Sequence, residues 1–118
     1  MAKLFDGELK LMEMLWENEP VSAKQLSLIA AEKIGWNKNT TYTVIKKLID
    51  KNAIAREEPN FICTSRLKRD DVRRAETESL LGRLYSGSKK ALFSALLEDG
   101  DMTEAELDEL REMINKKR

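Results

Sequence analysis

The chain has 118 residues, the length of one domain or of a domain with a small appendage, and its 21 lysines and arginines are balanced by 21 acidic residues. A net charge of zero excludes a uniformly basic, histone-like binder, and one cysteine without any histidine excludes an intrachain disulfide, a Cys/His zinc site and histidine-based catalysis. Because the chain also lacks a Gly-rich phosphate loop and a run of about 18 apolar residues, we expect a cytosolic protein that is not an enzyme, with no cofactor, metal or catalytic residues.

Two helices are predicted at the start of the chain, each marked by local signals. The first begins near Asp6, which can act as its N-cap, and it stops before residues 18–20 because proline disfavours helical backbone in the residue before it. The second begins at a capping box formed by Ser22 and Gln25, and Gly35 ends it. Apolar residues recur at helical spacing in both, so each helix has one buried face.

A third helix and a β-hairpin follow. Asn37 is the expected N-cap of the helix, and Asn52 tolerates the left-handed conformation that a helix end requires. Two short β-rich runs, residues 54–56 and 61–64, flank an acidic, turn-forming segment at residues 57–60. Because two strands alone are marginally stable, the hairpin must pack on the helices. The inward face of the third helix is predicted to consist of Val44, Ile45, Leu48 and Ile49.

The second half of the chain is predicted to form three more helices. The first starts at about Asp70 and is stopped by Gly87, and Ser88 begins the next one. Thr103 and Glu106 form a capping box for the last helix.

The order of these elements predicts a fold. Three helices followed by a hairpin, with a short connection between the second and third helices, is typical of a winged helix-turn-helix domain, whose third helix enters the DNA major groove. With a boundary near residues 66–71, we predict a mainly α chain. It consists of a winged helix-turn-helix DNA-binding domain at residues 1–68 and a three-helix dimerisation domain at residues 69–118.

Charge is uneven along the chain. Residues 1–32 carry three cations and six anions, residues 33–90 fourteen cations and seven anions, and residues 91–118 four cations and eight anions. A solvated helix face is the simplest interpretation of a charge run, but the basic segment contains the third helix, which favours a footprint for double-stranded DNA. Threonine offers a hydroxyl and a methyl group to bases, and lysine neutralises phosphate or binds guanine. The predicted DNA-binding residues are Lys38, Asn39, Thr40, Thr41, Thr43, Lys46, Lys47, Lys51 and, in the hairpin, Arg56.

The later helices carry wide apolar stripes for so short a segment. A unit of this size is not expected to cover such a surface alone, and pairing with a second copy of the chain would bury it; folding back on the first domain is the alternative. A two-fold homodimer also presents two recognition helices to a symmetric operator. The predicted dimerisation residues are Leu80, Leu84, Tyr85, Leu92, Phe93, Leu96, Leu97, Leu107, Leu110 and Ile114.

Three further side chains are assigned to the core. Cys63, in the second strand of the hairpin, is predicted to be a buried, unreactive thiol. Trp16 and Trp36 are predicted to anchor the helices rather than to bind a ligand.

Several stretches, taken in their order and spacing, resemble the penicillinase-repressor and methicillin-resistance-repressor family over nearly the whole chain. The first three lie in the predicted DNA-binding domain and the last two in the predicted dimerisation domain. They are residues 11–16 (LMEMLW), 20–23 (PVSA), 35–36 (GW) leading into 40–48 (TTYTVIKKL), 84–88 (LYSGS) and 96–100 (LLEDG).

The resemblance implies a homodimeric winged-helix repressor that binds an inverted-repeat operator of β-lactamase, antibiotic-resistance or related genes. It also implies a membrane-bound metalloprotease sensor that cleaves the repressor in the helix holding Ala95 and Leu96, where the best-known members have Asn-Phe. The family hairpin usually has glycine in its turn, where this chain has Pro59 and Asn60. The acidic flanks and the acidic turn motivate an alternative, a winged-helix protein-interaction adaptor that does not read DNA.

Overall fold

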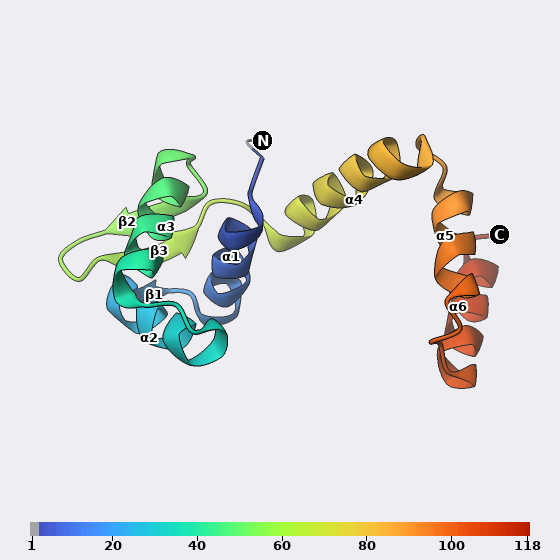
Figure 1. Cartoon of the computed structure of the whole chain (residues 1–118), viewed down its shortest axis with the longest axis horizontal. Coiled ribbons are helices and arrows are strands. Elements are labelled where there is room, and N and C mark those ends of the chain that lie inside the picture. The colour runs from blue at the N-terminus through green and yellow to red at the C-terminus, as the bar shows by residue number, and fades with distance from the viewer. Residues whose placement is uncertain (1–2) are drawn as a thin grey trace. The chain divides into compact units, whose positions relative to one another are not determined.

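The computed structural model describes residues 3–118, which form six helices and three short strands (Figure 1). The chain divides into two compact units, one up to Arg73 and one from Arg74 onward, so the division falls inside a helix. In chain order the elements are α1 (Asp6–Asn18), β1 (Val21–Ser22), α2 (Ala23–Ile34), α3 (Lys38–Asp50), β2 (Ile54–Glu57), β3 (Ile62–Ser65), α4 (Arg69–Tyr85), α5 (Lys89–Glu98) and α6 (Glu104–Lys116).

The helix-turn-helix, α2 followed by α3, begins and ends at the predicted residues. The Ser22 hydroxyl accepts a hydrogen bond of 3.1 Å from the N–H three residues further on, and the Asn37 side chain accepts the equivalent bond of 2.8 Å at the start of α3. Gly35 ends α2 with φ of +70°, and Asn52 follows α3 with φ of +62°. These capping predictions are confirmed, because each depends on groups only a few residues apart.

Helix α1 begins at Asp6, as predicted, but Asp6 is not its N-cap. Asp6 has helical backbone and lies in the first turn, where its charge favours the helix dipole, while the N-cap position is occupied by Phe5. Phenylalanine has no side-chain acceptor, so the Glu8 carboxylate accepts from the Phe5 N–H at 2.8 Å instead. At the other end the helix includes Asn18, whose amide donates to the Met14 carbonyl at 2.8 Å.

The hairpin is the larger part of a three-stranded antiparallel sheet in the order β1-β3-β2. The sequence did not predict β1, because a two-residue strand carries no alternation, and it forms only where Val21 lies opposite Cys63. Phe61 precedes β3 with φ of +50°, so a phenylalanine rather than Asn60 adopts the left-handed conformation beside the turn. Its carbonyl accepts from the Ala23 N–H at 2.9 Å. This bond joins the β2–β3 hairpin, which is the wing of the fold, to the start of α2.

The core of the first unit lies between α1, α2, α3 and the sheet. Trp16 and Trp36 are partly buried against it, as predicted, and the ring of Trp36 lies beside Gly7 of α1. Cys63 is fully buried, and burial raises the pKa of its thiol to about 11, in agreement with an unreactive role. The largest fully buried side chains are Leu11, Met12, Leu15, Leu26, Ile45, Leu48, Ile54, Thr41 and Cys63.

The second unit has well-marked helix starts but little interior of its own. The Ser88 hydroxyl accepts from the backbone at the start of α5, and Thr103 and Glu106 form the predicted capping box of α6. Among residues 74–118, all of which are described, only Leu81 is buried.

Within the described chain no helix is long and apolar enough to cross a membrane. Residues 3–118 also contain no cluster of three or more acidic, histidine or cysteine side chains suited to a metal ion.

Candidate nucleic-acid interface

Polar side chains follow the solvent-facing side of α3. Five exposed residues form what we call the α3 outer face: Asn39, Thr40, Thr43, Lys46 and Lys47. Lys38 is exposed at the first position of the same helix. The opposite side is buried, although only Ile45 and Leu48 of the four predicted inward residues are fully so, and Val44 and Ile49 are partly exposed. The helix therefore has the two contrasting faces that groove insertion requires.

Thr41 does not belong to this surface. Its side chain is fully buried, and its hydroxyl donates to the Asn37 carbonyl at 3.1 Å. It lies four residues before Ile45 on the core side of the helix, so it cannot reach a ligand. Thr43 differs, because its exposed hydroxyl donates to the Asn39 carbonyl at 2.9 Å and still offers an acceptor oxygen and a methyl group to solvent.

Lys51 is engaged within the protein. Its ammonium donates to the Glu8 carboxylate at 2.7 Å and to the Lys3 carbonyl at 3.0 Å, and it lies 4.5 Å from the centroid of the Phe5 ring. These contacts tie the end of α3 to the start of α1. We therefore leave Lys51 out of the α3 outer face and assign it to the support of the helix.

Glu8 is the anionic partner in this support, and it is almost completely buried. Burial alone would raise the pKa of its carboxyl, but the hydrogen bonds from Lys51 and from the Phe5 N–H, with the nearby charges of Lys51 and Lys47, hold it below its ordinary value. The carboxylate is therefore charged at neutral pH, and the buried pair satisfies both partners.

Arg56 of β2 is part of a row of rings and cations that joins the wing to α3. Its guanidinium lies 3.6 Å from the centroid of the Phe61 ring, and its Nε donates to Glu58. Phe61 meets Tyr42 of α3 edge-on, with 6.0 Å between the ring centroids, and the Lys38 ammonium lies 5.7 Å from the centroid of the Tyr42 ring. Arg56 is exposed, but its charge is already compensated, which limits it as a phosphate contact.

The sequence interpretation missed one member of this side of α3. Asp50 is exposed and follows Thr43 and Lys47 by seven and three residues, so it lies on the same side of the helix. A carboxylate there repels phosphate, which limits the candidate surface to the part of α3 before Asp50. The helical spacing in the sequence was sufficient to place Asp50 on this side of α3.

The second unit carries an apolar surface of its own. Between α5 and α6 lies a groove of about 420 Å³, lined by Phe93, Leu97, Leu107, Leu110, Arg111, Met113, Ile114 and Lys117. Five of the predicted dimerisation residues are more than half exposed: Leu84, Phe93, Leu96, Leu97 and Ile114. The others, Leu80, Tyr85, Leu92, Leu107 and Leu110, are partly buried. Met113, which the sequence interpretation omitted, is equally exposed.

Comparison with known proteins identifies the fold. The solution structure of the DNA binding domain of the repressor BlaI matches with a TM-score of 0.54 and 22% sequence identity, covering 60% of this chain and 93% of that domain. The predicted mainly α, winged-helix fold is therefore confirmed.

Comparison along nearly the whole chain identifies the family. The penicillinase repressor of Bacillus licheniformis is 22% identical over 116 residues, which cover 97% of this chain and 91% of the relative. The penicillinase repressor of Staphylococcus aureus is 26% identical over 111 residues, 92% of this chain and 88% of the relative. The methicillin resistance regulatory protein MecI of Mammaliicoccus sciuri is 25% identical over 117 residues, 98% of this chain and 95% of the relative. The pattern of the family described as "Penicillinase repressor" matches residues 5–116, and the chain belongs to this family.

Proposed function

We propose that this chain is a homodimeric transcriptional repressor that binds an inverted-repeat operator in double-stranded DNA through the α3 outer face. The observation that carries the proposal is the exposed row of asparagine, threonine and lysine side chains on a helix that is secured at both ends. Asn37 caps its start, and the Lys51–Glu8 pair ties its end to α1. The names of the relatives, penicillinase repressors and a methicillin resistance regulator, support antibiotic-resistance genes as the targets.

Each residue type on the outer face has a specific use in the major groove. The Asn39 amide is suited to adenine, and the Thr40 and Thr43 methyl groups are suited to thymine. Lys46 and Lys47 neutralise phosphates or bind guanine, and they supply affinity that depends on salt. The outer face thus combines base reading with backbone neutralisation.

Dimerisation through the second unit gives the repressor its affinity. One helix-turn-helix makes few contacts, whereas two linked copies bind with a high effective concentration at paired half-sites. The groove between α5 and α6, together with Leu84 and Leu96, offers the apolar surface for a second copy. Like chains related by a two-fold axis match an inverted-repeat operator.

Control by a sensor protease is part of the same proposal. The cleavage position implied by the family resemblance lies at Ala95 and Leu96, inside α5, and Leu96 is exposed. Because a protease needs extended backbone, cleavage there requires local unwinding of α5.

The acidic wing favours one competing function, a protein-interaction adaptor that does not read DNA. The exposed residues at its tip are Glu57, Glu58, Pro59 and Asn60, and the two carboxylates would repel the phosphates of DNA. Mobility-shift titration on the DNA upstream of the protein's own coding region separates the two functions. We expect a shifted band at low salt, and its absence would favour the adaptor.

Lys47→Ala is expected to weaken binding to the operator and to reduce the slope of log affinity against log salt by about one unit, because one phosphate contact is lost. Titrations at several salt concentrations measure this slope. Lys33→Ala is the matched control: its exposed ammonium is already paired with Glu17 of α1 at 3.5 Å and lies outside the α3 outer face, so we expect the slope to stay as in the wild type. A slope unchanged in Lys47→Ala removes this residue from the contact surface.

Asp50→Asn is expected to strengthen binding about two- to fivefold on specific and nonspecific duplexes alike, because it removes a repulsive charge near phosphate without adding a base contact. The same titrations measure it. A gain confined to one DNA sequence would instead indicate that the new amide reads a base.

A further inference from the structure

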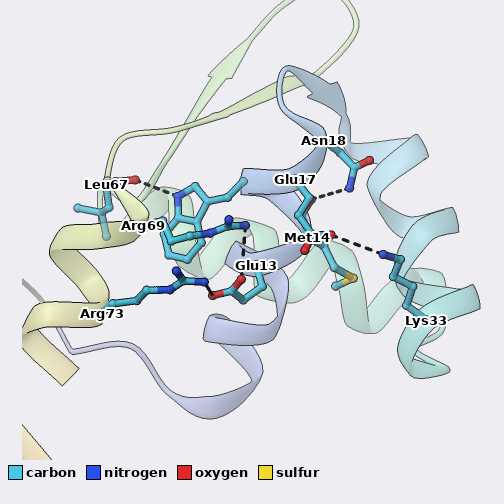
Figure 2. A network of polar contacts seen from close by, with 9 residues as sticks. Glu13, Met14, Glu17, Asn18, Lys33, Leu67, Arg69 and Arg73 are labelled. Atoms are coloured by element: carbon cyan, nitrogen blue, oxygen red, sulfur yellow. Dashed lines mark hydrogen bonds and ion pairs between the residues drawn. The ribbon is translucent and has the colours of Figure 1, made fainter. Parts of the chain in front are cut away.

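The start of α4 is joined to α1 by contacts with two residues of α1, Glu13 and Trp16 (Figure 2). The Trp16 indole N–H donates to the Leu67 carbonyl at 3.0 Å. The Arg69 guanidinium lies 5.6 Å from the centroid of the Trp16 ring, and its Nη2 is 3.5 Å from Glu13 Oε2. One turn later, Arg73 Nη2 approaches Glu13 Oε1 to 4.0 Å. One carboxylate of α1 thus holds two successive turns of α4.

Arg69 depends on this carboxylate. Its Nε and Nη2 atoms are buried and have no hydrogen-bond acceptor among the residues that the structure describes. Buried guanidinium nitrogens without hydrogen bonds are costly unless a nearby anion compensates the charge, and here the compensating group is Glu13, although about a third of the Arg69 side chain is exposed. Removing the Glu13 charge therefore favours movement of Arg69 away from the indole and into solvent.

The first residues of α4 belong to the DNA-binding unit by packing as well. Val72 is buried and joins the core cluster of that unit, and Leu67 packs against the same cluster. The helix continues without a break to Tyr85, although the unit ends at Arg73. The contacts around Glu13 thus determine how this continuous helix begins on the DNA-binding unit.

We propose that Glu13 is a positioning residue that selects the spacing between operator half-sites. The inference rests on the proposed dimeric DNA binding. In a dimer, the accepted spacing must match the separation and orientation of the two recognition helices, and these depend on how each α4 begins. Because Glu13 belongs to α1 and not to the α3 outer face, it acts on spacing and leaves the reading of each half-site unchanged.

The test uses the full-length protein and a duplex that the wild type selects from a random-sequence library. Its two half-sites are kept, and the spacer between them is lengthened or shortened one base pair at a time. For Glu13→Gln we expect single half-site affinity within about twofold of the wild type. The preference for the best spacer over its neighbours should fall about fivefold, a modest change because each partly exposed ion pair is individually weak.

Glu17→Gln is the matched control. Glu17 lies one turn further along α1 and pairs with Lys33 of α2 at 3.5 Å, so this variant removes the same charge without touching α4 (Figure 2). It should keep the wild-type spacer preference. Arg69→Met should also reduce the preference for the best spacer over its neighbours. Combining it with Glu13→Gln should reduce this preference no further, because both changes act on one contact.

The outcomes separate the inference from the proposed function. A folded Glu13→Gln protein with the wild-type spacer preference overturns the positioning role and leaves dimeric DNA binding intact. A loss of single half-site affinity large enough to account for the loss at the paired site also overturns it, because that result places the effect in the recognition helix. A wild-type protein that selects no duplex overturns the proposed function and this inference together.

Discussion

Phe93→Asp is expected to convert the protein from a dimer to a monomer and to lower its affinity for a paired-site operator about 100-fold or more, because the gain from linking two binding units is lost. Phe93 is more than half exposed at the groove between α5 and α6. A carboxylate placed there would have to be desolvated when the second copy covers the surface. Binding to a single half-site should be unchanged.

Sedimentation at micromolar concentration, combined with operator titration, measures both effects. Leu28→Asp is the matched control, since Leu28 is an equally exposed apolar residue that lies on α2 in the DNA-binding unit. It should remain dimeric. A wild-type protein that is monomeric at this concentration would contradict the proposed role of the α5–α6 surface.

Glu8→Gln is expected to lower the free energy of unfolding of the DNA-binding unit by about 1–3 kcal/mol at pH 7, because it leaves the Lys51 ammonium without its anion. The loss is smaller than for a fully buried pair, since a quarter of the Lys51 side chain is exposed and the ammonium can partly hydrate. The glutamine oxygen can still accept from the Phe5 N–H, so the change isolates the charge rather than the cap.

The effect should depend on pH in a defined direction. The folded state lowers the pKa of Glu8, so its stabilisation is fully present above the ordinary carboxyl pKa and is lost as pH falls through the lowered value. Wild type and Glu8→Gln should therefore differ at pH 7 and converge at strongly acidic pH. A constant difference across this range would show that the charge is not the cause.

Urea unfolding followed by tryptophan fluorescence is the appropriate measurement, because both tryptophans lie in the DNA-binding unit. Glu32→Gln removes an exposed carboxylate on α2 and should change stability little. Adding Lys51→Met to Glu8→Gln should recover part of the loss, since the double variant no longer has an unpaired ammonium. Further destabilisation by the second change would contradict the pairing.

The local signals of this sequence predicted most of the helix starts and ends. Ser22 and Asn37 accept from N–H groups three residues away, and Gly35 and Asn52 adopt the left-handed conformation that ends a helix. Such contacts form between near neighbours in the chain, so their pattern can be read without the fold. Periodicity likewise predicted the buried faces of α1, α2 and α3, and the order of elements indicated the winged helix.

Polarity along α3 did not determine which of its side chains are available to a ligand. Thr41 and Thr43 have the same chemistry and lie two positions apart, yet one is fully buried and the other exposed. Thr41 tolerates burial because its hydroxyl is satisfied by the Asn37 carbonyl of the same helix. A threonine can therefore occupy a core position that a lysine could not.

The remaining features were decided by partners distant in the chain. Lys51 has the cationic side chain of a typical DNA contact, but its ammonium donates a hydrogen bond to Glu8, 43 residues earlier in the chain. The indole of Trp16 donates to Leu67, 51 residues later, and β1 exists only through its pairing with β3. Local hydrogen bonds and helical periodicity depend on residues that are neighbours in the chain. The partner of a charge or of a strand depends instead on which distant segments the packed core brings together.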